Sequence, residues 1–212
     1  MPDTKPRLIV IAGPNGSGKT ALTKILCVKH PSWIKGLIEI NPDNIAQQEF
    51  GDWNDTKAII KAAKRADEIR EQCLSEQQSL LFETVLSIPE KIDYIRRAKK
   101  TGYFIRLIYV ATESPEINAM RVAWRVDQGG HTVPEDKIHS RYKRSLKLVL
   151  EAARLVDRAY FIDNSKSIKN PIDTIAPFPV FRMVNGVIAK IYLKEDDFPA
   201  WTKPIYTGAL KQ

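Results

Sequence analysis

The feature that most constrains this chain is the segment GPNGSGKT at residues 13–20. It fits the pattern G-x-x-x-x-G-K-[ST] in full, and it stands between the apolar run RLIVIA and a helical pattern that extends from residue 17 to about residue 30. Small residues let the backbone wrap closely around phosphate oxygens, so that successive N–H groups and a helix N-terminus face the negative charge. The segment therefore predicts a phosphate-binding loop after a buried first strand.

Each part of this loop has an expected task. Lys19 should reach the β- and γ-phosphates of ATP, and the hydroxyl of Thr20 should ligate Mg²⁺. The predicted nucleotide-binding residues are Gly13, Pro14, Asn15, Gly16, Ser17, Gly18, Lys19 and Thr20. Transporter-type ATPases share the loop but also need an LSGGQ signature, and LSEQQ at residues 74–78 lacks both glycines. We therefore exclude that class.

The rest of the chain alternates short apolar runs with amphipathic stretches. Strands are predicted at residues 37–40, 79–85, 103–112 and 159–165, and helices at about 55–76, 89–102, 115–126 (capped by Ser114) and from 134 onward. This alternation predicts an α/β fold of the P-loop NTPase type, with a mainly parallel sheet flanked by helices.

The pattern changes after residue 170. Two alternating runs, at residues 180–184 and 187–193, flank the dipeptide Asn185-Gly186, which is a strong signal for a β-hairpin turn. We therefore predict a kinase-like domain over residues 1–170 and a C-terminal hairpin extension of the same domain over residues 171–212.

Polar residues stand where two of the predicted strands end. Asp43 lies just beyond the second strand, where ligands bind in open α/β sheets, and it is a candidate to accept a hydroxyl proton and to assist the metal. A helix-capping role for the same segment is the alternative. Glu83 closes the apolar third strand, with Thr84 and Ser87 beside it, and these three are predicted to contact the substrate.

Arginines dominate the stretch from residue 121 to residue 145. Arg121 and Arg125 are spaced i, i+4 on one predicted helix, and Arg141 lies on the next helix. The glycines at 129 and 130 join the two helices, which together predict an arginine-rich lid over the phosphates. His131, in the connecting loop, is a weaker candidate. Asn164, at the end of the last parallel strand, is expected near the adenine.

With these segments together, the chain resembles the zeta toxin family, P-loop kinases of bacterial toxin–antitoxin systems. The resemblance rests on the phosphate loop, NPDNIA, FETVLS and the block R-x3-R-x3-GGH-x-VP-x3-I-x2-RY. It implies phosphorylation of UDP-N-acetylglucosamine with ATP and Mg²⁺, and an antitoxin protein as partner. It assigns Asp43 as proton acceptor, Glu83 and Thr84 as substrate contacts, and Arg121 with Arg125 or Arg141 as a phosphate clamp.

The formal charge of +8 suits an enzyme with polyphosphate substrates, but it also occurs in proteins that bind nucleic acid. No interleaving of aromatic and basic residues typical of single-strand binding stands out, so we expect no nucleic-acid partner. A metabolite or nucleotide kinase and a nucleic-acid-binding ATPase or end kinase stay as alternatives. Cys27 and Cys73 are expected to be buried, unpaired thiols of a cytoplasmic protein, and no apolar run is long enough for a membrane helix.

Overall fold

The computed structural model describes residues 5–51, 55–130, 132–165 and 177–211. His131 and the predicted domain boundary at residue 170 lie outside these ranges. Within them, the chain alternates strands and helices as far as residue 163, and a hairpin and a short helix follow.

A seven-stranded sheet forms the centre of the molecule, in the order β2-β3-β1-β4-β5-β6-β7. The strands β1 to β5 pair with one another in parallel, whereas β6 pairs antiparallel with both β5 and β7. The bounds are β1 (Arg7–Ala12), β2 (Ile38–Ile40), β3 (Leu80–Thr84), β4 (Phe104–Ala111), β5 (Arg158–Asp163), β6 (Phe178–Val184) and β7 (Val187–Ile191). The strand that leads into the phosphate loop is therefore in the middle of the sheet, between β3 and β4.

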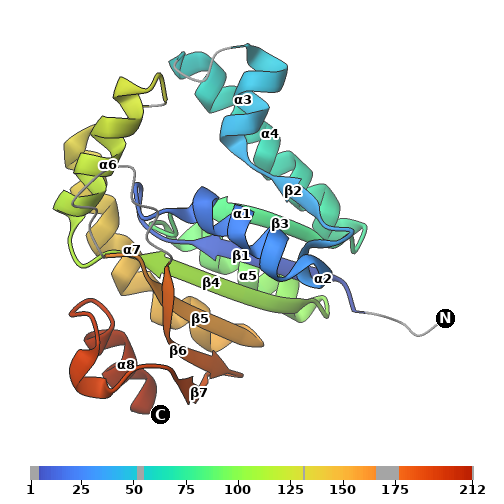
Figure 1. Ribbon diagram of the computed structural model, residues 1–212. Helices are drawn as coiled ribbons and strands as arrows, with labels where there is room; N and C mark the ends of the chain where they lie inside the picture. The colour runs from blue at the N-terminus through green and yellow to red at the C-terminus, as the bar shows by residue number, and fades with distance from the viewer. Residues whose placement is uncertain (1–4, 52–54, 131, 166–176, 212) are drawn as a thin grey trace.

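Helices cover both faces of the sheet (Figure 1). The bounds are α1 (Lys19–Lys29), α2 (Pro31–Ile34), α3 (Pro42–Phe50), α4 (Thr56–Ser75), α5 (Pro89–Lys100), α6 (Pro115–Asp127), α7 (Glu135–Leu155) and α8 (Lys203–Leu210), with a 3-10 turn η1 (Glu195–Asp197). Side chains of α1 and α2 pack with one face of the sheet, and those of α4, α5, α7 and α8 pack with the other. The fold is the predicted α/β fold with a mainly parallel sheet flanked by helices.

Successive side chains of each strand point to opposite faces of the sheet, so two separate hydrophobic cores form. The first strand has five successive residues that are fully buried, because α1 covers one face and the larger helical layer covers the other. Ile9 and Ile11 join the smaller core with Leu22 and Leu26 of α1. Leu8 and Val10 point into the larger core, which also contains the aromatic side chains of the C-terminal segment.

The predicted hairpin is confirmed. Asn185 and Gly186 both have positive φ angles, 49° and 82°, as a type I′ turn requires, and they connect β6 to β7. Helices α2, α3 and α8 were not predicted from the sequence. The α6 helix begins after Ser114 as expected, but the Ser114 side chain makes no capping hydrogen bond.

The two cysteines differ in exposure. Cys73 is a buried free thiol, whereas Cys27 is exposed, because it lies on the solvent side of α1. The prediction that both thiols are buried is therefore wrong for Cys27. Among the described residues, no helix is long and apolar enough to cross a membrane.

Candidate functional site

The carboxyl ends of the parallel strands meet at one edge of the sheet, and the phosphate loop lies there. In Figure 1 this edge lies between α6 on one side and α3 on the other. The register pairs Ala12 of β1 with Thr84 of β3 and with Tyr109 of β4. Residues that follow each strand are therefore brought close to the loop, although they are far apart in the sequence.

The glycines of the loop are required by its close packing. A Cβ atom on Gly13 would lie 1.9 Å from the Val110 carbonyl oxygen, and one on Gly18 would lie 2.4 Å from the Asn164 amide nitrogen. Gly18 also has a φ of 98° and stands at the N-cap of α1, where no side chain bonds the first free N–H groups. The first turn contains no acidic residue. This helix N-terminus therefore fits a phosphate group.

Lys19 lies across the loop. Its Nζ atom donates hydrogen bonds to the carbonyl oxygens of Gly13 and Pro14, each at 3.0 Å. Burial of the ammonium lowers the pKa of Lys19 to about 8, while nearby charges act in both directions. Glu83 and Asp43 raise the pKa, and Arg125 and Arg141 lower it. These predicted site residues therefore share the electrostatic surroundings of one ammonium group.

Glu83 bridges two hydroxyl groups of α1. Thr20 donates to one carboxylate oxygen at 2.9 Å, and Thr23 donates to the other at 2.8 Å. Thr84 instead closes the turn after β3, since its hydroxyl accepts from the N–H of Leu86 at 3.1 Å and its carbonyl accepts from the N–H of Gly13 at 3.1 Å. Glu83 thus faces the predicted metal ligand, and Ser87 follows half-buried in the connection to α5.

Asp43 lies in the first turn of α3 and is exposed. The helix is capped by Asn41, whose side-chain oxygen accepts from the N–H of Asp43 at 2.9 Å. The segment therefore does cap this helix, as the alternative proposed, but through Asn41 and not through Asp43. The Asp43 carboxylate is left at the same end of the sheet as Lys19.

The three lid arginines are not equivalent. Arg121 on α6 donates through Nη2 to the Asn164 carbonyl oxygen at 2.9 Å, and burial lowers its pKa while Asp163 raises it. Its Nη1 atom is buried without a partner among the described residues. The charges of Arg125 and Arg141 lower the pKa of Lys19. Arg141 Nη1 lies 3.5 Å from Oδ1 of Asn15 in the loop.

Asn164 supports the phosphate loop from the end of β5. Its side-chain amide donates to the Ser17 carbonyl oxygen at 2.9 Å, and its backbone N–H donates to the Ala111 carbonyl oxygen at 2.8 Å. Two residues of this neighbourhood were missed from the sequence. Thr23 shares Glu83 with Thr20, and its spacing of three residues on a helix was the available signal. Asn118 is fully buried against Gly16, and no sequence signal identified it.

The residues present fit a magnesium–nucleotide complex. Mg²⁺ in phosphoryl-transfer sites is held by one or two protein oxygens, with phosphate and water oxygens completing the shell. The Thr20 hydroxyl and the Glu83 carboxylate meet at the open end of the loop, and Asp43 lies nearby. Among the described residues, no group of three or more acidic, histidine or cysteine side chains forms a metal cage.

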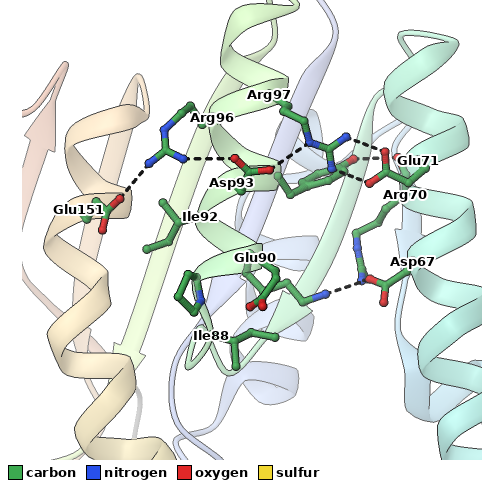
Figure 2. A pocket seen from close by; sticks show the side chains of 13 residues that line it. Asp67, Arg70, Glu71, Ile88, Glu90, Ile92, Asp93, Arg96, Arg97 and Glu151 are labelled. Atoms are coloured by element: carbon green, nitrogen blue, oxygen red, sulfur yellow. Dashed lines mark hydrogen bonds and ion pairs between the residues drawn. The ribbon is translucent and has the colours of Figure 1, made fainter.

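A hollow of about 870 Å³ lies between α4, α5 and α7 (Figure 2). Its cations are already paired. Arg97 binds both carboxylate oxygens of Glu71, Lys91 binds Asp67 at 3.0 Å, and Arg96 binds Glu151 at 2.9 Å. None of the predicted site residues lines this hollow. The hollow therefore shares no residue with the candidate site at the carboxyl edge of the sheet.

Comparison with known proteins gives three kinds of similarity. The family model described as Zeta toxin matches residues 1–176. An uncharacterized protein of Haemophilus influenzae is 30% identical over 136 residues, which are 64% of this chain and 92% of that protein.

Two solved structures share the fold at lower identity. One, from the PezAT chromosomal toxin–antitoxin system of Streptococcus pneumoniae, aligns with a TM-score of 0.58 at 17% identity and covers 99% of this chain and 86% of that chain. The other, AvrRxo1-ORF1:-ORF2 with ATP, aligns with a TM-score of 0.66 at 18% identity over 88% of this chain. This chain spans only 61% of the length of that second structure's chain.

Proposed function

This chain belongs to the Zeta toxin family, and on that basis we propose that it is an ATP-dependent kinase acting as a toxin. It transfers the γ-phosphoryl group of ATP to a hydroxyl group of a sugar nucleotide of the UDP-N-acetylglucosamine type. The observation on which this rests is the hydrogen bond of 2.9 Å from Thr20 of the phosphate loop to the Glu83 carboxylate, next to Lys19, whose Nζ atom lies across the same loop. Phosphoryl transfer needs this combination of a cationic phosphate site and carboxylates for the metal and the acceptor.

The phosphate loop binds the triphosphate. The N–H groups of the loop and of the first turn of α1 face the phosphate oxygens, and Lys19 exchanges the carbonyl oxygens of Gly13 and Pro14 for the β- and γ-phosphates. The Thr20 hydroxyl and the Glu83 carboxylate would hold Mg²⁺, which would neutralise negative charge on the triphosphate.

Asp43 serves the acceptor. Its neighbour Asn41 caps the helix, and the charge of the exposed Asp43 carboxylate raises the pKa of Lys19. In the proposed reaction it accepts the proton of the attacking hydroxyl as the bond from oxygen to the γ-phosphorus forms and the bond to ADP breaks. We assign Thr84, at the end of β3, and Ser87, in the connection to α5, to the acceptor side, whereas Glu83 lies against Thr20.

We assign different arginines to the phosphate end and the nucleoside end of ATP. Arg125 and Arg141 lie near Lys19, where they stabilise the charge that develops on the transferring group. Arg121 lies against Asn164 at the end of β5, so we assign it to the nucleoside end of ATP. The glycines at 129 and 130 let the helices α6 and α7 close over the site, and Gly130 already packs against the Arg125 side chain.

The two solved structures support ATP as the ligand and an antitoxin protein as the partner. The pneumococcal structure belongs to a toxin–antitoxin system, and the AvrRxo1-ORF1:-ORF2 structure contains ATP. We extend both points to this chain, which would then be neutralised by an antitoxin protein. A small metabolite without a nucleotide is the alternative acceptor, and an assay of ADP release with each acceptor distinguishes the two.

The test is ADP release by the purified chain with ATP and Mg²⁺, in the presence and absence of UDP-N-acetylglucosamine. We expect the sugar nucleotide to stimulate release, and expression of the wild type, but not of Lys19→Ala, to arrest bacterial growth. Stimulation by small hydroxyl metabolites alone, together with harmless expression, would contradict the sugar-nucleotide toxin.

A further inference from the structure

The segment after residue 176, which the family match leaves out, is packed into the same core as the nucleotide-binding sheet. Phe181 of β6 stacks on Phe161 of β5 with ring centroids 4.3 Å apart, and Trp201 lies 5.8 Å from the ring of Tyr109 on β4. Trp201 itself is only 5% exposed. The ring of Trp201 is therefore fixed in place against the main sheet.

The indole of Trp201 also makes a polar contact with the end of β5. Its Nε1–H donates to a carboxylate oxygen of Asp163 at 2.7 Å, and Asp163 is only 1% exposed. A buried carboxylate needs several donors to offset its lost hydration. Among the described residues, the N–H and the hydroxyl of Ser165 also donate to Asp163, at 2.8 Å and 2.5 Å. Trp201 thus joins Ser165 in holding the turn at residues 163–165.

Asn164 lies at the centre of that turn, and it contacts the phosphate loop directly. Its amide donates to the Ser17 carbonyl oxygen at 2.9 Å, and its own carbonyl oxygen accepts from Arg121 at 2.9 Å. The fit is close, since a single added carbon on Gly18 would meet the Asn164 amide at 2.4 Å. A small rotation of the turn would therefore move the loop or separate Asn164 from it.

From this chain of contacts we infer that Trp201 is a positioning residue for the nucleotide site. It acts through Asp163 and Asn164 on the phosphate loop and on Arg121, and it does not touch the nucleotide. The C-terminal segment is thereby part of the ATP-binding apparatus of this chain. This inference rests on the proposed function only in taking ATP as the ligand.

The test compares two conservative variants of the same aromatic cluster in the full chain. Trp201→Phe keeps an aromatic ring but removes the donor to Asp163. Tyr206→Phe is the matched control, because it removes a tail hydrogen bond, from Tyr206 to Glu195 at 2.7 Å, that does not involve Asp163. The measurements are the dissociation constant of ATP by calorimetry, the values of kcat and KM for ATP, and the melting temperature.

We expect Trp201→Phe to weaken ATP binding and raise KM for ATP by roughly fivefold, the scale of a partly lost charge-assisted hydrogen bond, with a smaller change in kcat. Tyr206→Phe should leave ATP affinity unchanged even where its melting temperature falls as much. Equal ATP affinity in Trp201→Phe and wild type, or equal weakening in both variants, would overturn the inference. If Trp201→Phe is insoluble, Ser165→Ala removes a different donor from Asp163 and is subject to the same criterion.

The two proposals fail separately. A wild-type chain that does not bind ATP contradicts the proposed function. A wild-type chain that binds ATP, with unchanged affinity in Trp201→Phe, contradicts the positioning role alone.

Discussion

The carboxylate of Glu83 accepts a hydrogen bond of 2.9 Å from the hydroxyl of Thr20, although the two residues are 63 positions apart. The contact exists because β3 pairs directly with β1, so the end of β3 lies beside the start of α1. It places a carboxylate at the hydroxyl that the loop motif offers to a metal ion. Glu83 is therefore better placed to support Mg²⁺ than to contact the acceptor directly.

Glu83→Gln tests this assignment. Loss of the charge should weaken the Mg²⁺ shell, so that kcat falls about a hundredfold and more Mg²⁺ is needed for half-maximal activity. A titration of activity against Mg²⁺ measures both effects. Glu39→Gln, an exposed carboxylate on the neighbouring strand β2, is the control and should behave as wild type. An unchanged Mg²⁺ requirement in Glu83→Gln would remove Glu83 from the metal site.

Asp43→Asn should separate binding from chemistry. The amide cannot accept the hydroxyl proton, so kcat should fall by about 10²- to 10⁴-fold. The affinity for ATP, measured by calorimetry, should change little, because Asp43 lies outside the phosphate loop. Glu49→Gln on the same helix, whose carboxylate pairs with Arg65 at 3.6 Å, is the matched control. Full activity in Asp43→Asn would show that another group receives the proton.

The affinity for ATP should fall as the pH rises through about 8. Burial lowers the pKa of Lys19 to about 8 in the free protein, and bound phosphates should raise it again. Above pH 8 the free protein binds fewer protons at Lys19 than the complex does, so ATP binding takes up a proton and weakens by up to tenfold per pH unit.

Calorimetry with ATP from about pH 7 to about pH 9.5 measures this effect. The pKa of Lys91 is also lowered to about 8 by burial, yet Lys91 pairs with Asp67 away from the loop. Lys91→Met should therefore keep the pH dependence, whereas Lys19→Met should lose it along with most of the affinity. An ATP affinity that does not change with pH in the wild type would contradict a lowered pKa of Lys19 in the free protein.

The lid arginines should differ in their kinetic signatures. Arg125→Ala should lower kcat by about 10²-fold or more, because its charge acts near Lys19 at the transferring phosphate. Arg121→Ala should chiefly raise KM for ATP, since Arg121 contacts the end of β5. Arg144→Ala is the control, because Arg144 is exposed on α7. The reverse pattern, with KM affected by Arg125 and kcat by Arg121, would exchange the two roles.

Much of the fold was accessible from the sequence, because its signals are local. The phosphate loop, the buried strands and the Asn185-Gly186 turn each depend on residues next to one another in the chain. Asp43 was placed correctly at a strand end for the same reason. The capping alternative could not be decided, because Asn41 and Asp43 are both good capping residues and only geometry selects between them.

The contacts between segments could not be predicted in this way. Strand order in a parallel sheet depends on packing between distant segments, so the sharing of Glu83 by Thr20 and Thr23 was not visible. Arg121 and Arg125 share a helix spacing, but the position of β5 directs Arg121 toward Asn164. The bond from Trp201 to Asp163 spans 38 residues and joins the tail, for which the sequence offered no functional interpretation, to the site.

The central claim is that ATP, Asp43 and a sugar-nucleotide hydroxyl meet in one site. The most direct measurement is transfer of label from γ-labelled ATP to UDP-N-acetylglucosamine by the wild type, with Asp43→Asn and a panel of small hydroxyl metabolites in parallel. The account predicts a labelled sugar nucleotide that is absent with Asp43→Asn. ATP consumption with no label on the sugar nucleotide, or equal labelling by Asp43→Asn, would contradict it.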